Sequence, residues 1–206
     1  MRRLLLSFLL VGAVTTSGWA TTALGFKSIT NNNATNASIG EAQLFVDISD
    51  PGSNQVKFHF YNDGPQACSI TDVYFDDGML LGIASIAGGF GVNFSEGANP
   101  PNLPGGSAIS FVSTFSADSN APRQRNGVNP GEWLDITFNL LNDQTFDDAL
   151  AALGDGSLRI GIKVQGFANG GSESFVNMPV PEPGTLLLLG SGLLGLAGTV
   201  RRRTKK

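Results

Sequence analysis

Three segments of the chain alternate strictly between apolar and polar residues, and no other sequence feature limits the fold as much. The alternation covers residues 56–61, 134–140 and 158–164. Successive side chains of a β-strand point to opposite faces, so each segment is predicted to be a strand with one apolar and one polar face. Eight apolar positions should face one shared core: Leu134, Ile136, Phe138, Leu140, Leu158, Ile160, Ile162 and Val164. The positions between them should point outward: Asp135, Thr137, Arg159 and Lys163.

Shorter apolar segments between turn sequences extend this pattern. Weaker strands are predicted at residues 44–48, 70–75, 79–84, 90–94 and 109–115. Clusters of Asp, Asn, Gly and Pro separate the segments, as in Asp50-Pro51-Gly52. Residues 21–178 amount to one domain by length. Many short strands in one domain predict a mainly β fold, a single antiparallel β-sandwich or jelly-roll-like domain with one short helix.

That helix is predicted at residues 145–154. Thr145 is suited to cap its N-terminus, and two acids follow in the first turn, where the helix dipole favours them. Apolar residues repeat at helical spacing on one face: Phe146, Leu150 and Leu153. Polar stretches are expected to be loops. Residues 31–36 should form a flexible lead into the first strand, and residues 95–107 and 116–131 should be long loops, either functional or disordered.

The N-terminus has the three parts of a secretory leader. Arg2 and Arg3 are followed by an apolar stretch over residues 4–14. Gly18 and Ala20 then place small residues at the −3 and −1 positions of a signal peptidase site. An uncleaved N-terminal anchor is the alternative. We expect residues 1–20 to be a signal peptide that signal peptidase removes, so that the mature chain begins near Thr21.

The C-terminal segment, residues 179–206, has a layout of its own. The tripeptide Pro181-Glu182-Pro183 precedes an apolar run over residues 184–200, and a basic cluster follows: Arg201, Arg202, Arg203, Lys205 and Lys206. As a helix the run would be about 25 Å long, at the short end of what crosses a ~30 Å hydrocarbon core. The positive charges would remain on the cytoplasmic side. The segment is therefore predicted to be a transmembrane helix with a stop-transfer signal.

This order of tripeptide, apolar run and basic cluster resembles the PEP-CTERM sorting signal. The resemblance is limited to the tail. It implies that an exosortase recognises the tripeptide and processes the chain, and it implies an association with extracellular polysaccharide and biofilm. The protein would be anchored transiently in the inner membrane and then reach the cell surface or the extracellular space. The alternative is a plain single-span anchor, in which the prolines only begin the helix.

Charge and cysteine content narrow the function of the exported region. Residues 21–178 contain six Lys and Arg against sixteen Asp and Glu, a net charge of −10. Nucleic acid binding needs clustered positive charge, so a nucleic acid partner is not expected. Cys68 is the only cysteine, which rules out an internal disulfide. It is predicted to be a half-buried strand residue rather than a nucleophile.

The sequence offers no convincing catalytic, metal or cofactor site. His59, the only histidine, lies on the polar face of a predicted strand. Asp76-Asp77-Gly78 lacks the alternating ligand spacing of a calcium loop and is better explained as a turn. Paired carboxylates could serve a glycosidase, but the sequence does not show which of six acids approach each other. The six are Asp72, Asp76, Asp77, Glu96, Asp135 and Glu173.

Three functions therefore stay open. The first is a non-enzymatic exported surface or extracellular-matrix protein sorted by an exosortase. The second is a carbohydrate-binding β-sandwich, in which Trp133, Tyr61 and Tyr74 offer stacking faces. The third is a secreted hydrolase with paired acids. A solvent-facing row of aromatic residues would favour the second, and two facing acids in a cleft would favour the third.

Overall fold

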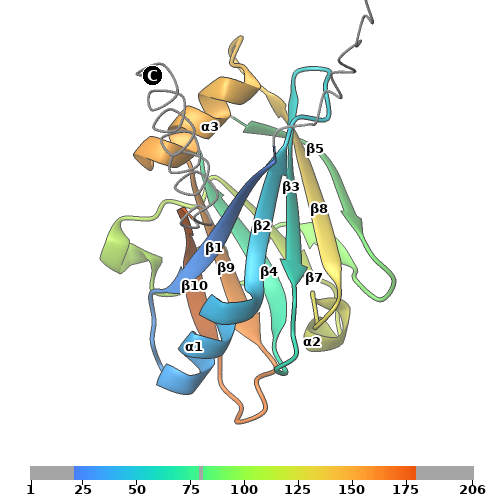
Figure 1. Cartoon of the computed structure of the whole chain (residues 1–206), viewed down its shortest axis with the longest axis vertical. Coiled ribbons are helices and arrows are strands. Elements are labelled where there is room, and N and C mark those ends of the chain that lie inside the picture. The colour runs from blue at the N-terminus through green and yellow to red at the C-terminus, as the bar shows by residue number, and fades with distance from the viewer. Residues whose placement is uncertain (1–20, 79–80, 180–206) are drawn as a thin grey trace, which may run out of the picture.

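The computed structural model describes residues 21–78 and 81–179, and their fold is mainly β, as predicted (Figure 1). Ten strands follow one another along the chain: β1 Thr22–Ser28, β2 Leu44–Ser49, β3 Gln55–Asn62, β4 Ser69–Asp76, β5 Leu81–Gly88, β6 Phe94–Glu96, β7 Phe115–Ser119, β8 Trp133–Leu140, β9 Arg159–Gln165 and β10 Glu173–Pro179. The helices are α1 Ala34–Gln43, α2 Arg123–Asn126 and α3 Phe146–Asp155, with a 3-10 turn, η1, at Gly106–Ile109.

All ten strands belong to one antiparallel sheet, in the order β5-β8-β3-β2-β1-β10-β9-β4-β7-β6. The sheet curls until its edge strands β5 and β6 come into contact, so it is nearly closed into a barrel. The predicted sandwich, which would consist of two packed sheets, is therefore wrong. Both walls of the core are parts of one sheet. The mainly β content and the antiparallel pairing agree with the sequence prediction.

The interior of the barrel is built by the alternating segments. All eight residues predicted to share a core are buried, with exposed fractions of 0–5%. Residues of β3 and β4 complete this core, and the rings of Phe58, Phe75 and Phe138 meet edge to face at its centre. Asp135, Thr137, Arg159 and Lys163 lie between the core positions on the outward face, half-buried. The period-2 pattern thus correctly predicted which of these side chains of β8 and β9 point into the core and which point outward.

Helix α3 confirms the predicted helix and covers the upper end of the barrel (Figure 1). Its first turn has a capping box, because Thr145 and Asp148 each accept a hydrogen bond from the other's main-chain N–H group. The apolar face packs on the core through Ala149 and Leu153. Gly156, with φ 81°, ends the helix in the left-handed conformation that favours glycine.

Helix α1 was not predicted, because residues 31–36 were expected to be a flexible lead. Instead Asn33 caps this helix by accepting hydrogen bonds from the N–H groups of Thr35 and Asn36, at 2.9 and 3.2 Å. Gly40 packs directly on a ring of β10, since an added Cβ would lie 2.2 Å from Cζ of Phe175. Strand β1, which precedes the helix, also has no counterpart among the predicted strands.

The segments between β4 and β8 differ most from the prediction. Residues 90–94 and 109–115 were expected to be strands, but only Phe94 and Phe115 lie in β6 and β7. The chain between these two strands instead packs over the outer face of the sheet, where Leu103 and Phe111 cover Tyr74. Residues 116–131 were predicted to be a loop but contain most of β7 and all of α2. Tyr74 is wholly buried beneath the segment between β6 and β7.

Cys68 was predicted to be a half-buried strand residue, but it lies just before β4 and is more deeply buried than expected, with an exposed fraction of 2%. Its thiol lies among polar groups, 3.1 Å from the Gln43 amide nitrogen and 3.6 Å from that of Asn62. Burial raises the pKa of the Cys68 thiol to about 11, so the thiolate is scarce at neutral pH. This agrees with the predicted structural role.

Several predicted features fall outside the described residues. The leader with Gly18 and Ala20, the tripeptide at residues 181–183, the apolar run and the basic cluster all lie beyond residues 21–179. Among the residues that are described, no helix is long and apolar enough to cross a membrane.

Candidate functional site

Four rings form a row across the outer face of β2, β3 and β8. Tyr61 lies opposite Phe45 on one neighbouring strand and opposite Trp133 on the other. The ring centroids follow one another in the order Phe45, Tyr61, His59 and Trp133, at spacings of 5.5, 5.7 and 5.6 Å. Neighbouring rings are tilted by only 30–33°. Rings this close and this nearly parallel overlap in part, so the four side chains form one continuous line on the outer face, which we name the aromatic row.

Carboxylates border the aromatic row and fix one of its rings. Asp135 lies beside His59 on the adjacent strand, with 2.6 Å between Oδ1 and Nδ1 of the imidazole. The second oxygen of Asp135 is 3.5 Å from Nζ of Lys57. Because a carboxylate accepts hydrogen bonds, Nδ1 of His59 is the donor, and the Nε2 atom of a neutral ring is then an acceptor. The row thus combines aromatic surface with polar groups that can bond hydroxyls.

A hollow of about 300 Å³ lies along the row. His59, Tyr61 and Trp133 line it, with carboxylates on its rim: Asp47, Asp63 and Glu132. Its volume is at the small end of the range for ligand sites, which are usually apolar with a few placed polar groups. The hollow therefore suits one unit of an extended ligand rather than a large enclosed molecule.

The turn after β5 supports the end of the row at Trp133. Gly89 lies against the indole, because an added Cβ would be 3.0 Å from Nε1. Its N–H group also bonds the carbonyl oxygen of Trp133 at 3.0 Å. The next residue, Phe90, is fully exposed, and Gly91 adopts φ 90° beside the Glu132 carboxylate. Phe90, whose ring is fully exposed, thus belongs to the turn that supports Trp133.

The acids around the row also affect its tyrosine. Burial, and then the charges of Asp47 and Asp63, raise the pKa of Tyr61 to about 12. Its hydroxyl group lies 3.4 Å from Oδ1 of Asp47. Burial likewise raises the pKa of Asp47 above its usual range. Tyr61 consequently remains a neutral phenol throughout the physiological pH range, with both a ring face and an O–H donor.

Sequence reasoning found only part of this site. Trp133 and Tyr61 were predicted as stacking residues, and the structure brings them to one face on adjacent strands. Tyr74 was also predicted to be a stacking residue. This prediction is wrong, because Tyr74 is wholly buried under the loop that contains Leu103. Phe45 was missed, although its place between buried residues of β2 shows that it points outward.

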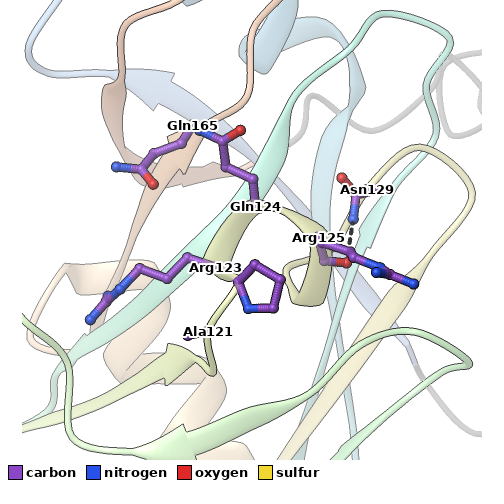
Figure 2. Close-up of a pocket in the computed structure, with 7 residues that line it drawn as sticks. Ala121, Arg123, Gln124, Arg125, Asn129 and Gln165 are labelled. Atoms are coloured by element: carbon purple, nitrogen blue, oxygen red, sulfur yellow. Dashed lines mark hydrogen bonds between the residues drawn. The ribbon is translucent and has the colours of Figure 1, made fainter.

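A larger hollow, of about 700 Å³, lies beside α2 (Figure 2). Its lining includes Arg123, Arg125, Gln124 and Gln165. Arg123 is already paired with Asp118, whereas Arg125 has no carboxylate in ion-pair range among the described residues. Figure 2 shows the two arginine side chains leaving α2 on opposite sides, so their charges do not converge on one ligand. This hollow is therefore a weaker candidate site than the aromatic row.

The described chain ends at residue 179, where the match to a known sorting motif begins. A family model described as the PEP-CTERM protein-sorting motif matches residues 179–203. The chain carries a PEP-CTERM sorting motif. The matched range includes Pro181, Glu182 and Pro183, as the sequence resemblance predicted. Neither the curated proteins nor the solved structures contain a match to the chain.

The PEP-CTERM motif indicates a protein that is exported and sorted by an exosortase. It says nothing of a reaction carried out by the barrel itself. The six acids considered for a hydrolase are mostly engaged by the protein's own groups. Asp72 and Glu173 are buried, Asp76 pairs with Arg159, Asp77 accepts from the N–H group of Leu81, and Asp135 holds His59.

The two buried acids have structural roles that their partners explain. Glu173 accepts hydrogen bonds from the N–H groups of Asn32 and Asn33, at 2.9 and 2.6 Å, and so fixes the chain before α1. Asp72 lies 3.5 Å from Nζ of Lys163 and accepts from the Thr71 hydroxyl at 2.7 Å. Over residues 21–78 and 81–179, no group of three or more His, Cys, Asp or Glu could hold a metal ion.

Proposed function

We propose that this chain is a non-enzymatic exported surface or extracellular-matrix protein, sorted by an exosortase through its C-terminal motif. The single observation that carries the proposal is the PEP-CTERM match over residues 179–203. In this proposal signal peptidase cuts after Ala20, and the apolar run over residues 184–200 holds the chain transiently in the inner membrane. The exosortase then removes this anchor, and the barrel passes to the cell surface or beyond.

The sorting step can be tested by the mass of the exported protein. Expressed in a host that contains an exosortase, the protein should lose the region of residues 184–206, and intact-mass spectrometry will measure the loss. The same gene in that host with its exosortase deleted should give a product that retains this region. Equal masses in the two hosts would contradict the proposal and leave the tail as a simple anchor.

For the barrel we propose binding of extracellular polysaccharide along the aromatic row. The observation that favours this role is the line of rings on the outer face at Phe45, Tyr61, His59 and Trp133, of which Trp133 is exposed and the others are half-buried. A sugar ring has an apolar face of C–H groups and a rim of hydroxyls. The first stacks on aromatic rings, and the second bonds carboxylates and imidazole nitrogens. An open strip suits a long chain, which can enter and leave at both ends.

Trp133 should be the strongest contributor to this binding. It is 37% exposed and has the largest ring of the row, and the turn at Gly89 fixes its position. Trp133→Ala should cost about 1–2 kcal/mol, a roughly five- to thirty-fold loss of affinity for the matrix exopolysaccharide of the host. Once residues 1–20 are removed, Trp133 is the only tryptophan in the chain, so its fluorescence reports the titration of the wild type directly.

A control separates stacking from general damage to the surface. Val112 is 64% exposed, is distant in sequence from the row and lies on the loop that covers Tyr74. Val112→Ala should bind as tightly as the wild type, and Trp133→Phe should retain part of the affinity. Affinity electrophoresis with the purified exopolysaccharide compares all four proteins. If Trp133→Ala binds as well as the wild type, the row is not the binding site.

A further inference from the structure

The rim of the hollow along the aromatic row carries negative charge without a matching positive charge. Asp47, Asp63 and Glu132 line it, Asp63 exposed and the other two half-buried. Among the described residues, no Lys or Arg lies in ion-pair range of any of these three carboxylates. Lys57 shares the outer face of β3, but its Nζ lies 3.5 Å from Oδ2 of Asp135. The surface along the row is therefore locally acidic.

The other basic residues of the barrel lie away from this rim. Residues 21–178 contain five Lys and Arg besides Lys57. Four of them pair with acids outside the row: Lys27, Arg123, Arg159 and Lys163. The fifth, Arg125, lines the hollow beside α2. A counter-charge for the carboxylates of the rim therefore has to come from the solvent or from a ligand.

Two of these carboxylates are held at the same end of the row by the pairing of β3 with β8. Asp63 follows the last residue of β3, and Glu132 precedes the first residue of β8. The N–H group of Asn62 bonds the carbonyl oxygen of Glu132 at 3.3 Å, and that of Gly131 bonds the carbonyl oxygen of Asn62 at 2.7 Å. Asn129 donates to Oε2 of Glu132 from its main-chain and side-chain nitrogens, at 2.9 and 3.0 Å. The Glu132 carboxylate is thus fixed before a ligand arrives, which lowers the entropic cost of binding.

The negative charge of the rim is also felt inside the hollow. Burial is the first cause that raises the pKa of Tyr61 to about 12, and the charges of Asp47 and Asp63 are the next. Both carboxylates therefore act on a hydroxyl group that lines the hollow. An ionised carboxylate only accepts hydrogen bonds, whereas an ammonium group is positively charged and only donates them. The hollow is thus complementary to an ammonium group in both charge and hydrogen bonding.

We propose that the aromatic row binds a polysaccharide with free amino groups, whose ammonium groups meet the carboxylates of the rim while its sugar rings lie along the row. This inference rests on the proposed polysaccharide-binding role of the barrel and names the class of ligand. A neutral chain has the same apolar sugar faces but gains nothing from the charges of the rim. A chain with carboxylate or sulfate groups would bring like charges together, which lowers affinity.

The experiment compares two oligosaccharides that differ only at the amino group. A hexamer of β-1,4-linked glucosamine and the N-acetylglucosamine hexamer of the same linkage are titrated into the exported protein at about pH 6, where amines and carboxylates are both charged. The fluorescence of Trp133 reports both titrations. An exposed ion pair changes affinity by roughly 1.5- to 5-fold, so the glucosamine hexamer should bind at least about fivefold tighter at low salt. The preference should fall in about 1 M sodium chloride, where the Debye length is only about 3 Å.

Two double variants locate the preference on the molecule. Asp63→Asn with Glu132→Gln removes two charges of the rim, keeps the shapes of both side chains and should abolish the preference. The matched control, Asp143→Asn with Asp147→Asn, removes two charges from exposed residues beyond the other end of β8 and should retain it. Hexalysine carries ammonium groups without sugar rings and should bind the wild type at least about fivefold more weakly than the glucosamine hexamer does. Circular dichroism checks that both variants are folded.

The outcomes distinguish this inference from the proposed role of the barrel. Equal binding of the two hexamers, or tighter binding of the acetylated one, would overturn the inference and leave polysaccharide binding in place. An equal loss of preference in both double variants would also overturn it, because the total charge of the barrel would then be responsible. Hexalysine that binds as tightly as the glucosamine hexamer would indicate a basic peptide as the partner instead. If neither hexamer binds, the inference is wrong, and the electrophoresis with the exopolysaccharide of the host decides the proposed role by itself.

Discussion

Replacement of Pro181-Glu182-Pro183 by three alanines should abolish processing, leaving the exported protein at full length in a host that shortens the wild type. Pro181 and Pro183 have no main-chain N–H group and force extended conformations on their neighbours. Alanine favours helix, so the substituted segment could join a helix formed by the apolar run. The enzyme would then lose both the extended shape and the charge of Glu182. Intact-mass spectrometry of the exported product measures the outcome.

A matched control keeps the change outside the tripeptide. Thr185→Ala alters the beginning of the apolar run but leaves residues 181–183 intact, and it should be processed like the wild type. The glutamate can be examined separately by Glu182→Gln, which keeps the shape and removes the charge. If the triple-alanine protein is shortened as fast as the wild type, the tripeptide is not the recognition element.

The second large effect is expected in the core, where Ile136→Ala should lower the free energy of unfolding by about 2–5 kcal/mol. Ile136 is fully buried on β8, opposite Phe58 of β3 and Ile86 of β5. Truncation removes apolar contact and leaves a cavity that the paired strands cannot close. Urea unfolding of residues 21–178, followed by circular dichroism, measures the change.

The neighbouring position provides the comparison. Thr137→Ala alters the opposite face of the same strand, where the side chain is half-buried, and should change the free energy of unfolding far less. A loss below about 0.5 kcal/mol for Ile136→Ala would contradict full burial at this position. A mainly helical spectrum for the wild type would contradict the fold itself.

The sequence predicted the parts of the fold that rest on local pattern. Strands β3 and β8 show period-2 alternation over their whole length, and β9 departs from it only at Gly161, which is buried beneath Leu103 and Phe111. Helix α3 has a cap, acids in its first turn and an apolar face. In each case the signal lies within one segment. The facing of residues such as Ile136 and Ile160 follows from it directly, because a shift of one residue would expose the whole apolar set.

The sequence did not predict what depends on distant partners. Strand β1 reads Thr-Ala-Leu-Gly-Phe-Lys-Ser, a weak pattern whose stability comes from its place between β2 and β10. Helix α1 has no strong apolar face, and it is fixed by Asn33, by the ring of Phe175 and by the carboxylate of Glu173. Such contacts join residues far apart in the chain, which no local pattern can specify.

The same distinction applies to the candidate site. Outward positions of single strands could be predicted, which is why Tyr61 and Trp133 were identified. Their neighbours could not be, because the register of β2, β3 and β8 decides which rings meet. Tyr74 also alternates outward from its strand, yet the loop with Leu103 and Phe111 folds over it. Exposure of a strand face depends on loops that the alternation does not describe.

The central place of β10 has a consequence for the order of folding. Strands β5, β8, β3, β2 and β1 lie on one side of it, and β9, β4, β7 and β6 on the other. Without Glu173–Pro179 the paired strands form two separate groups. Because these residues come last before the sorting motif, β10 can join the two groups only when almost the whole chain is available. Completion of the sheet therefore waits for the segment that leads into the motif.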